Sequence, residues 1–256
     1  MYRFIVGDNA VLKGKIADFI SRKPQYSNYF GIDFDNVEYI ECSETLLLRK
    51  SYDNFSRIYY LSSNADQLVG LLGLLSGKDI INIPSKTELS VNLTDILLAG
   101  GYALYATYER QVNNHVESRG EFAGYFAEQE DVSTIYDILY SKFNPFTDRL
   151  PSRQELMEMA GKKEILVNRD GENSKVTGIL TFTLKKAVCN FNHLIDTTES
   201  SNGLFLLLKM FDYMGENNVA QSAIWVNINN NKMKKIYQVL GYKPDGLKDY
   251  TFIKQQ

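Results

Sequence analysis

Apolar and polar residues alternate with helical and strand periods most clearly in the C-terminal half of the chain. Residues 130–143 carry apolar side chains at 135, 138, 139 and 143, the spacing of an amphipathic helix. A second helix is predicted to start at Pro151 and Ser152, which forms a capping-box pattern with Glu155, and to end at Gly161. Stretches rich in β-branched residues follow at 164–170 and 176–186, and the turn between them predicts a hairpin.

The remaining elements continue this alternation to the end of the chain. We expect a third strand at 187–196, an apolar helix at 204–216, a short buried strand at 222–229, an amphipathic helix at 230–240 and a last strand at 249–256, after a turn at 244–246. Trp225 lies in the short apolar strand and is expected in the core. This order predicts an α/β fold of the α+β type, a mixed sheet with helices on its faces, in which strands joined by a helix are parallel neighbours.

The N-terminal half contains a weaker copy of the same ending. Residues 78–86 predict a strand, 88–101 a helix and 103–112 a strand, and both helices run into a Gly-Tyr pair, at Gly101-Tyr102 and Gly241-Tyr242. Two copies of such a unit arise by duplication or by chance. The most polar intervening stretch, 111–124, is the candidate linker, so we predict an N-terminal α/β domain at 1–118 and a second domain at 119–256.

Composition narrows the classes of partner and ligand. The 256 residues carry a net charge of −3 that is spread along the chain, so no nucleic-acid or anionic-membrane partner is expected. Two cysteines without CxxC spacing and two histidines are too few soft ligands for a zinc site, so no metal is expected. The longest apolar stretch, 68–77, is about half of a membrane span, and Asp8 and Lys13 interrupt the N-terminal apolar run. A cytoplasmic protein is the expectation.

The run WVNINNNKMKKIYQVLGYKPDG, residues 225–246, carries a recognisable pattern: a strand, then Asn-x-x-small-x-x-aliphatic-Tyr, then Gly-Tyr. With the order of elements, it makes residues 120–256 resemble the GNAT family of acyl-CoA N-acyltransferases. The N-terminal half is interpreted as a partial or degenerate GNAT-like unit; it has Leu97 where the C-terminal half has Tyr237. The matching positions are Asn230, Met233, Ile236, Tyr237, Gly241 and Tyr242.

The resemblance implies transfer of an acetyl or other short acyl group from acyl-CoA, with acetyl-CoA as cosubstrate, to a primary amine of a small molecule or peptide. It implies that Tyr237 protonates the departing thiolate: a phenol of pKa about 10 stays protonated at neutral pH, and a thiol of pKa about 8.5 departs more easily when a positioned donor meets the developing charge. Backbone N–H groups near Leu194 and Ile195 would stabilise the oxyanion. His193 is a candidate base, with a hydrogen-bonded strand histidine as the alternative. Asn230 is a candidate contact for the cofactor, although helix capping also explains it.

The expected phosphate loop departs from the family pattern of Arg or Gln, two free positions, Gly, one free position, then Gly or Ala. The aligned run SSNGLF, residues 200–205, retains only the glycine, while Glu199 adds a negative charge and Phe205 adds bulk. Two alternatives therefore stay open: a non-catalytic binding module of the same fold, or a transferase that uses another acyl carrier. The residues whose main chain is predicted to hold the cofactor phosphates are Ser201, Asn202, Gly203 and Leu204.

Overall fold

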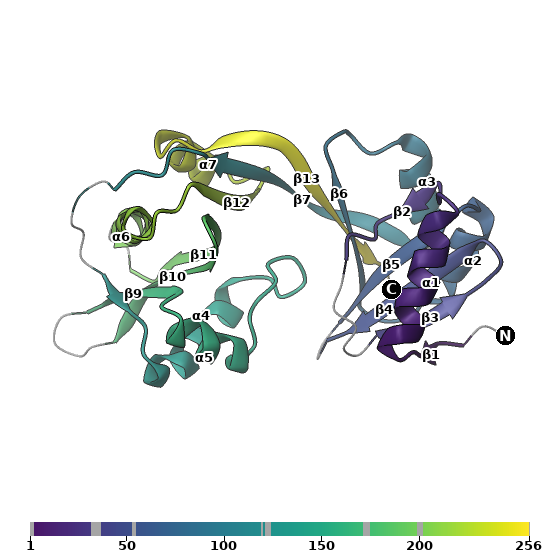
Figure 1. The fold of residues 1–256 in the computed structure, drawn as a ribbon, viewed down its shortest axis with the longest axis horizontal. Helices are drawn as coiled ribbons and strands as arrows, with labels where there is room; N and C mark the ends of the chain where they lie inside the picture. Colours follow the sequence, from purple (N-terminus) through teal and green to yellow (C-terminus); the bar gives the residue numbers. More distant parts are fainter. Residues whose placement is uncertain are drawn as a thin grey trace. The chain divides into compact units, whose positions relative to one another are not determined.

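The computed structural model describes residues 3–31, 37–52, 55–118, 120, 124–170, 175–198 and 202–255, and the chain forms two compact units (Figure 1). Unit 1 consists of Met1–Tyr108 together with Gly246–Gln256, and unit 2 of Glu109–Asp245. Two strands, β7 (Tyr102–Asn113) and β13 (Lys243–Lys254), therefore contribute residues to both units. The boundary expected between residues 118 and 119 differs from this division, because residues 248–253 pair antiparallel with β6 of unit 1.

Unit 1 is a mixed sheet with helices on both faces. Its described strands run in the order β1-β3-β4-β5-β6-β13, and β2 pairs with β5. Strands β5 and β6 are parallel and are joined by α2, whereas the pairs β1–β3, β3–β4, β4–β5, β2–β5 and β6–β13 are antiparallel. The elements are β1 (Ile5–Val6), α1 (Asn9–Ser21), β2 (Tyr26–Ser27), β3 (Val37–Glu41), β4 (Thr45–Ser51), β5 (Ser56–Ser62), α2 (Ala65–Leu74), β6 (Asp79–Ser85) and α3 (Val91–Ala99).

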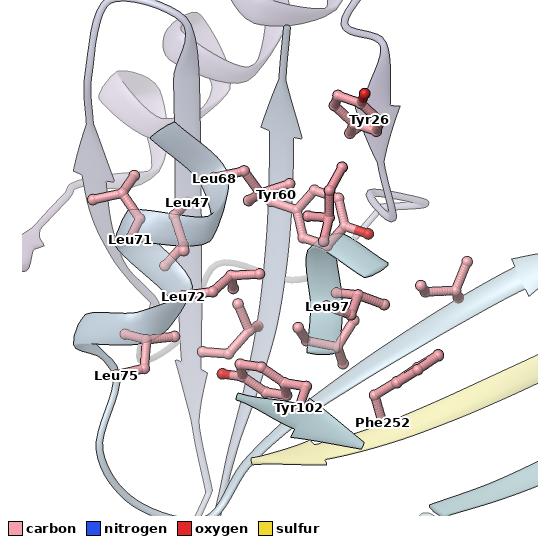
Figure 2. Packing of buried hydrophobic residues seen from close by; sticks show 14 of the residues in the cluster. Tyr26, Leu47, Tyr60, Leu68, Leu71, Leu72, Leu75, Leu97, Tyr102 and Phe252 are labelled. Atoms are coloured by element: carbon pink, nitrogen blue, oxygen red, sulfur yellow. The ribbon is translucent and has the colours of Figure 1, made fainter. Parts of the chain in front are cut away.

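Strand alternation divides the core of unit 1 between the two faces of its sheet. On β4, Leu46 and Leu48 pack with the buried residues of α1, whereas Leu47 packs with those of α2 and α3. Each helix starts at a side-chain cap, at Asp8, Asn64 and Ser90 respectively. Figure 2 shows the cluster under α2 and α3, where Leu97 and Tyr60 point into the same core as Phe252 of β13.

Unit 2 has the same plan with longer strands. Its described strands run in the order β12-β11-β10-β9-β8, with β11 and β12 parallel and joined by α6, and the other neighbouring pairs antiparallel. Helices α6 and α7 cover one face of this sheet, and α4 and α5 cover the other. The elements are β8 (Tyr125–Phe126), α4 (Val132–Lys142), α5 (Arg153–Gly161), β9 (Ile165–Arg169), β10 (Val176–Lys185), β11 (Val188–Asp196), α6 (Asn202–Glu216), β12 (Gln221–Asn227) and α7 (Asn231–Val239), with a short 3-10 turn η1 (Gln129–Asp131) before α4.

The mixed sheet with helices on its faces is confirmed, as is the order of elements predicted for the C-terminal half. The capping box at Ser152 and Glu155 is present at the start of α5. The predicted turn at 244–246 is wrong, because β13 begins at Lys243 and runs through Pro244 and Gly246. Within the part of the chain that the structure describes, no helix combines the length and apolar character needed to cross a membrane.

Candidate functional site

In unit 2, the two parallel strands β11 and β12 stop pairing before either one ends. The last paired residues are Phe191 and Ile224, yet β11 continues to Asp196 and β12 to Asn227. We call residues 192–196 and 225–227 the strand parting. Among the described residues, no segment pairs with the β12-facing edge of β11 along this stretch. The parting therefore offers main-chain hydrogen-bonding groups to an extended ligand.

An irregularity in β11 changes which of its side chains face which side of the sheet. Thr181 of β10 faces His193, whereas the next residue, Phe182, faces Phe191, so Asn192 is an extra residue on β11. Beyond this bulge, Leu194 packs toward α6 and Ile195 packs toward α4 and α5. The two residues expected near the oxyanion thus lie within the parting, with side chains on opposite faces.

Tyr237 lies beside the point where the strands part. Its ring meets the Phe191 ring edge-on, with 5.8 Å between the ring centroids, and meets the Tyr242 ring at the same centroid distance. The side chain is only 4% exposed, and burial raises the pKa of its hydroxyl well above the usual range. No hydrogen bond of this hydroxyl is found among the described residues. The phenol is therefore protonated at neutral pH and has its proton available.

A hollow lies between the start of α6 and the outer face of α7. It has a volume of about 250 Å³, and its lining residues are Leu204, Lys235, Ile236, Val239 and Leu240. The lining is apolar apart from Lys235, a side chain for which we find no ion pair within the described ranges. Phe205, which sequence alone suggested could crowd this helix, is 44% exposed and does not fill the core. Tyr237 is not among the lining residues, although the adjacent Ile236 is.

The first turn of α6 is capped by a carboxylate. Oδ2 of Asp196 accepts a hydrogen bond from the backbone N–H of Gly203 at 3.0 Å. The other carboxylate oxygen accepts from the backbone N–H of Thr198 at 2.9 Å and from its hydroxyl at 2.6 Å. Ser201 lies outside the described residues, and Asn202 is the first residue of α6. The Gly203 amide predicted to hold a cofactor phosphate is thus already bound to an anion of the protein itself.

His193 is held as a structural residue, which argues against the base role considered from sequence. Its Nδ1 lies 2.8 Å from the Thr181 hydroxyl and its Nε2 lies 2.8 Å from the carbonyl oxygen of Asp148. The carbonyl can only accept, so Nε2 carries the proton and Nδ1 accepts from Thr181. Burial lowers the pKa of the ring below its usual value. Both nitrogens are thereby engaged by the protein, and neither is free to take a proton from an amine.

The structure also places two further residues named from the sequence. Asn230 has the capping role considered for it as the N-cap of α7: its side-chain oxygen accepts from the backbone N–H of Met233 at 3.2 Å. Trp225, expected in the core, is 41% exposed, because β12 alternates and directs Ile224 and Val226 into the core instead. The exposed indole at the parting was missed because the apolar run Ile224-Trp225-Val226 was interpreted as buried on both faces.

In unit 1 the corresponding gap lies between the parallel strands β5 and β6, and the side chain of Asn28 fills it. Strands β5 and β6 pair only at Ser56–Asp79 and Arg57–Ile80, and the buried amide of Asn28 crosses between them beyond that point. Its Nδ2 donates to the carbonyl oxygens of Ile58 (2.9 Å) and Asn82 (3.1 Å). Its Oδ1 accepts from the backbone N–H of Tyr60 at 2.8 Å. The main-chain groups that are open in unit 2 are thus satisfied internally in unit 1.

Unit 2 fits the thioester arm of an acyl-CoA better than it fits the diphosphate. An extended thioester arm suits the unpaired edge of β11 and the apolar hollow beside α7. A diphosphate at the N-terminus of α6 does not fit, because the Asp196 carboxylate occupies the Gly203 amide there and carries the same sign of charge.

Comparison with solved structures shows that the chain has a GNAT-type fold. It resembles a GNAT-family acetyltransferase from Colwellia psychrerythraea with a TM-score of 0.59 and 11% identity, each chain covered completely. A tandem GNAT protein from the clavulanic acid biosynthesis pathway matches with a TM-score of 0.59 and 9% identity, over 100% of this chain and 99% of that one. A GCN5-related N-acetyltransferase from Sphaerobacter thermophilus matches with a TM-score of 0.61 and 11% identity, over 93% of this chain and 85% of that one. No protein-family model and no curated protein matches the sequence.

Proposed function

We propose that this chain transfers an acetyl or other short acyl group from an acyl-CoA thioester to a primary amine of a small molecule or peptide, using unit 2. The observation that carries the proposal is the strand parting, where an unpaired edge of β11 lies next to a protonated tyrosine. The GNAT-type fold, shared with acetyltransferases, supports the same class of reaction. Unit 1 has Leu97 at the equivalent helix position and a closed parting, so it takes no part in the chemistry.

A thioester donor supplies an electrophilic carbonyl carbon and a thiolate leaving group. The unpaired main chain between Asn192 and Asp196 aligns the donor and offers N–H groups to the carbonyl oxygen as charge develops on it. The amine nitrogen forms the new bond to carbon, the C–S bond breaks, and its electron pair stays on sulfur. The proton lost by the amine leaves to solvent, since His193 has no free nitrogen to accept it.

Tyr237 stabilises the departing sulfur. Because burial raises the pKa of its phenol above about 10, complete proton transfer to a thiolate of pKa about 8.5 is uphill by roughly 2 kcal/mol or more. The hydroxyl therefore acts first as a hydrogen-bond donor to the developing negative charge. Tyr237 gives its proton to the thiolate only in a step in which solvent returns a proton to the phenolate.

The test is thiol release from acetyl-CoA with a panel of primary amines, comparing the native protein with Tyr237→Phe. Loss of the donor should lower kcat by about 100-fold with little change in the Kd for the thioester, since general-acid groups typically contribute 10² to 10⁴. Tyr213→Phe, on α6 in the same core, is the matched control and should retain turnover. Equal turnover in the native protein and Tyr237→Phe would remove Tyr237 from the mechanism.

A second function is favoured by one specific contact. Capping of Gly203 by Asp196 suits a binding module of the same fold that no longer takes CoA. A ligand that binds only the folded state raises the melting temperature. Absence of any shift with millimolar acetyl-CoA, together with no thiol release for any amine, would select the module over the transferase.

A further inference from the structure

The strongest feature outside the mechanism is the carboxylate bound at the first turn of α6. Asp196 ends β11, at the far end of the strand parting, and faces Gly178 of β10 across the sheet. From there its side chain reaches the N-terminus of α6, seven residues along the chain. Both carboxylate oxygens are used, one on Gly203 and one on Thr198, so the group is held in place from two sides.

The chemistry of this contact is that of an internal anion. A helix N-terminus carries partial positive charge and free N–H groups, and an acidic side chain there is stabilising. An incoming phosphate would compete for the same amide and would approach a negative charge at hydrogen-bonding distance.

We infer that Asp196 takes the place of a ligand phosphate at the N-terminus of α6, so that the donor is recognised by its thioester arm and not by its diphosphate. The inference rests on the proposed function for the identity of the donor. The inference narrows the class of donor to acyl thioesters of the pantetheine type. The nucleotide part of the donor contributes little to binding at α6. The apolar lining of the hollow beside Leu204 and Ile236 suits the same part of the donor.

The experiment compares two probes, acetyl-CoA and S-acetylpantetheine, by calorimetric titration of the native protein and of Asp196→Asn. The native protein should bind the two with Kd values within about threefold of each other. Asp196→Asn removes the negative charge and replaces one acceptor oxygen with an NH2 donor, so it should tighten acetyl-CoA by about tenfold and leave S-acetylpantetheine unchanged. A native preference for acetyl-CoA of a hundredfold or more, or weaker acetyl-CoA binding by Asp196→Asn, would overturn the inference.

Two additions keep failure of the inference separate from failure of the proposed function. Inorganic pyrophosphate is titrated as a third probe: Asp196→Asn should gain binding that the native protein lacks, even if neither thioester binds and the transferase proposal is lost. No gain with pyrophosphate would count against the inference on its own. Asp137→Asn, an exposed acid on α4, controls for net charge, and urea unfolding of each variant confirms that it is folded.

Discussion

In unit 1 the amide of Asn28 crosses between β5 and β6 where they stop pairing, whereas in unit 2 no side chain among the described residues bonds across between β11 and β12 beyond their last pair, Phe191 and Ile224. The difference continues along the strands. The fifth residue of β5 is Tyr60, fully buried, and the fifth residue of β11 is Asn192, which is exposed. The same arrangement of strands thus gives a gap filled by a side chain in unit 1 and an unpaired strand edge in unit 2.

The free end of the central strand is supported differently in the two units. In unit 1 the support comes from within the parting, through Asn28 and the short strand β2. In unit 2 it comes from the opposite face of the sheet, where His193 ties β11 to the carbonyl of Asp148. Because His193 supports β11 through residues that follow α4, the β12-facing edge of β11 stays available to a ligand.

The largest expected effect comes from Asn28→Ala, which removes the crossing amide from unit 1. The N–H of Tyr60 and the carbonyls of Ile58 and Asn82 would be left without their side-chain partner in a buried site, at a cost of about 3 kcal/mol or more. Urea unfolding measures the loss. Asn92→Ala, which removes one part-buried hydrogen bond to the Tyr26 hydroxyl, is the control and should cost less than about 1 kcal/mol. Equal losses would mean that the parting of unit 1 is not held by Asn28.

An intermediate effect is expected from the pH dependence of stability at His193. Burial lowers the pKa of the folded-state ring, so the unfolded chain takes up this proton first as the pH falls below about 6.5. The native protein should therefore lose up to about 1 kcal/mol from this group between pH 6.5 and 5.5, and His193→Gln should lack that part of the slope. Urea unfolding at several pH values gives the slope. The same substitution at exposed His115 is the control, and an unchanged slope in His193→Gln would contradict the assignment.

The smallest effect is expected at Trp225, the fifth residue of β12, whose counterpart in β6 is the buried Ile83. Trp225→Ala should cost less than about 1 kcal/mol, because the side chain is 41% exposed, whereas Ile83→Ala should cost about 2–5 kcal/mol. Trp225 is the single tryptophan of the chain, so its fluorescence also reports a ligand that binds at the parting. A cost at Trp225 equal to that at Ile83 would place the indole in the core after all.

Sequence patterns were informative where the interaction is local. The helix of Tyr237, its end at Gly241 and the capping box at Ser152 each depend on residues within a few positions of one another. Gly241 has a φ of +92°, which a side chain would oppose, so a helix stop there could be predicted from residue type alone.

The features that decide the site depend on distant residues. Asn28 bonds residues 30 and 54 positions away, and His193 bonds a carbonyl 45 positions away, so no local pattern predicts either contact. The Asp196 cap joins two elements through a turn whose composition only suggested a loop. Pro244 and Gly246 are turn residues by type, yet they lie inside β13, a strand whose neighbours in the sheet, β6 and β7, come from far earlier in the sequence.

The route of β13 has a consequence for how the chain acquires its structure during translation. Unit 1 begins the sequence, but the strand that pairs with β6 and supplies Phe252 to its core is synthesised only after all of unit 2. Nascent domains usually fold in order from the N-terminus, and here the first unit must wait, with β6 exposing an edge, until the ribosome has made residues 248–253. The unit without an open site is therefore the last to be finished.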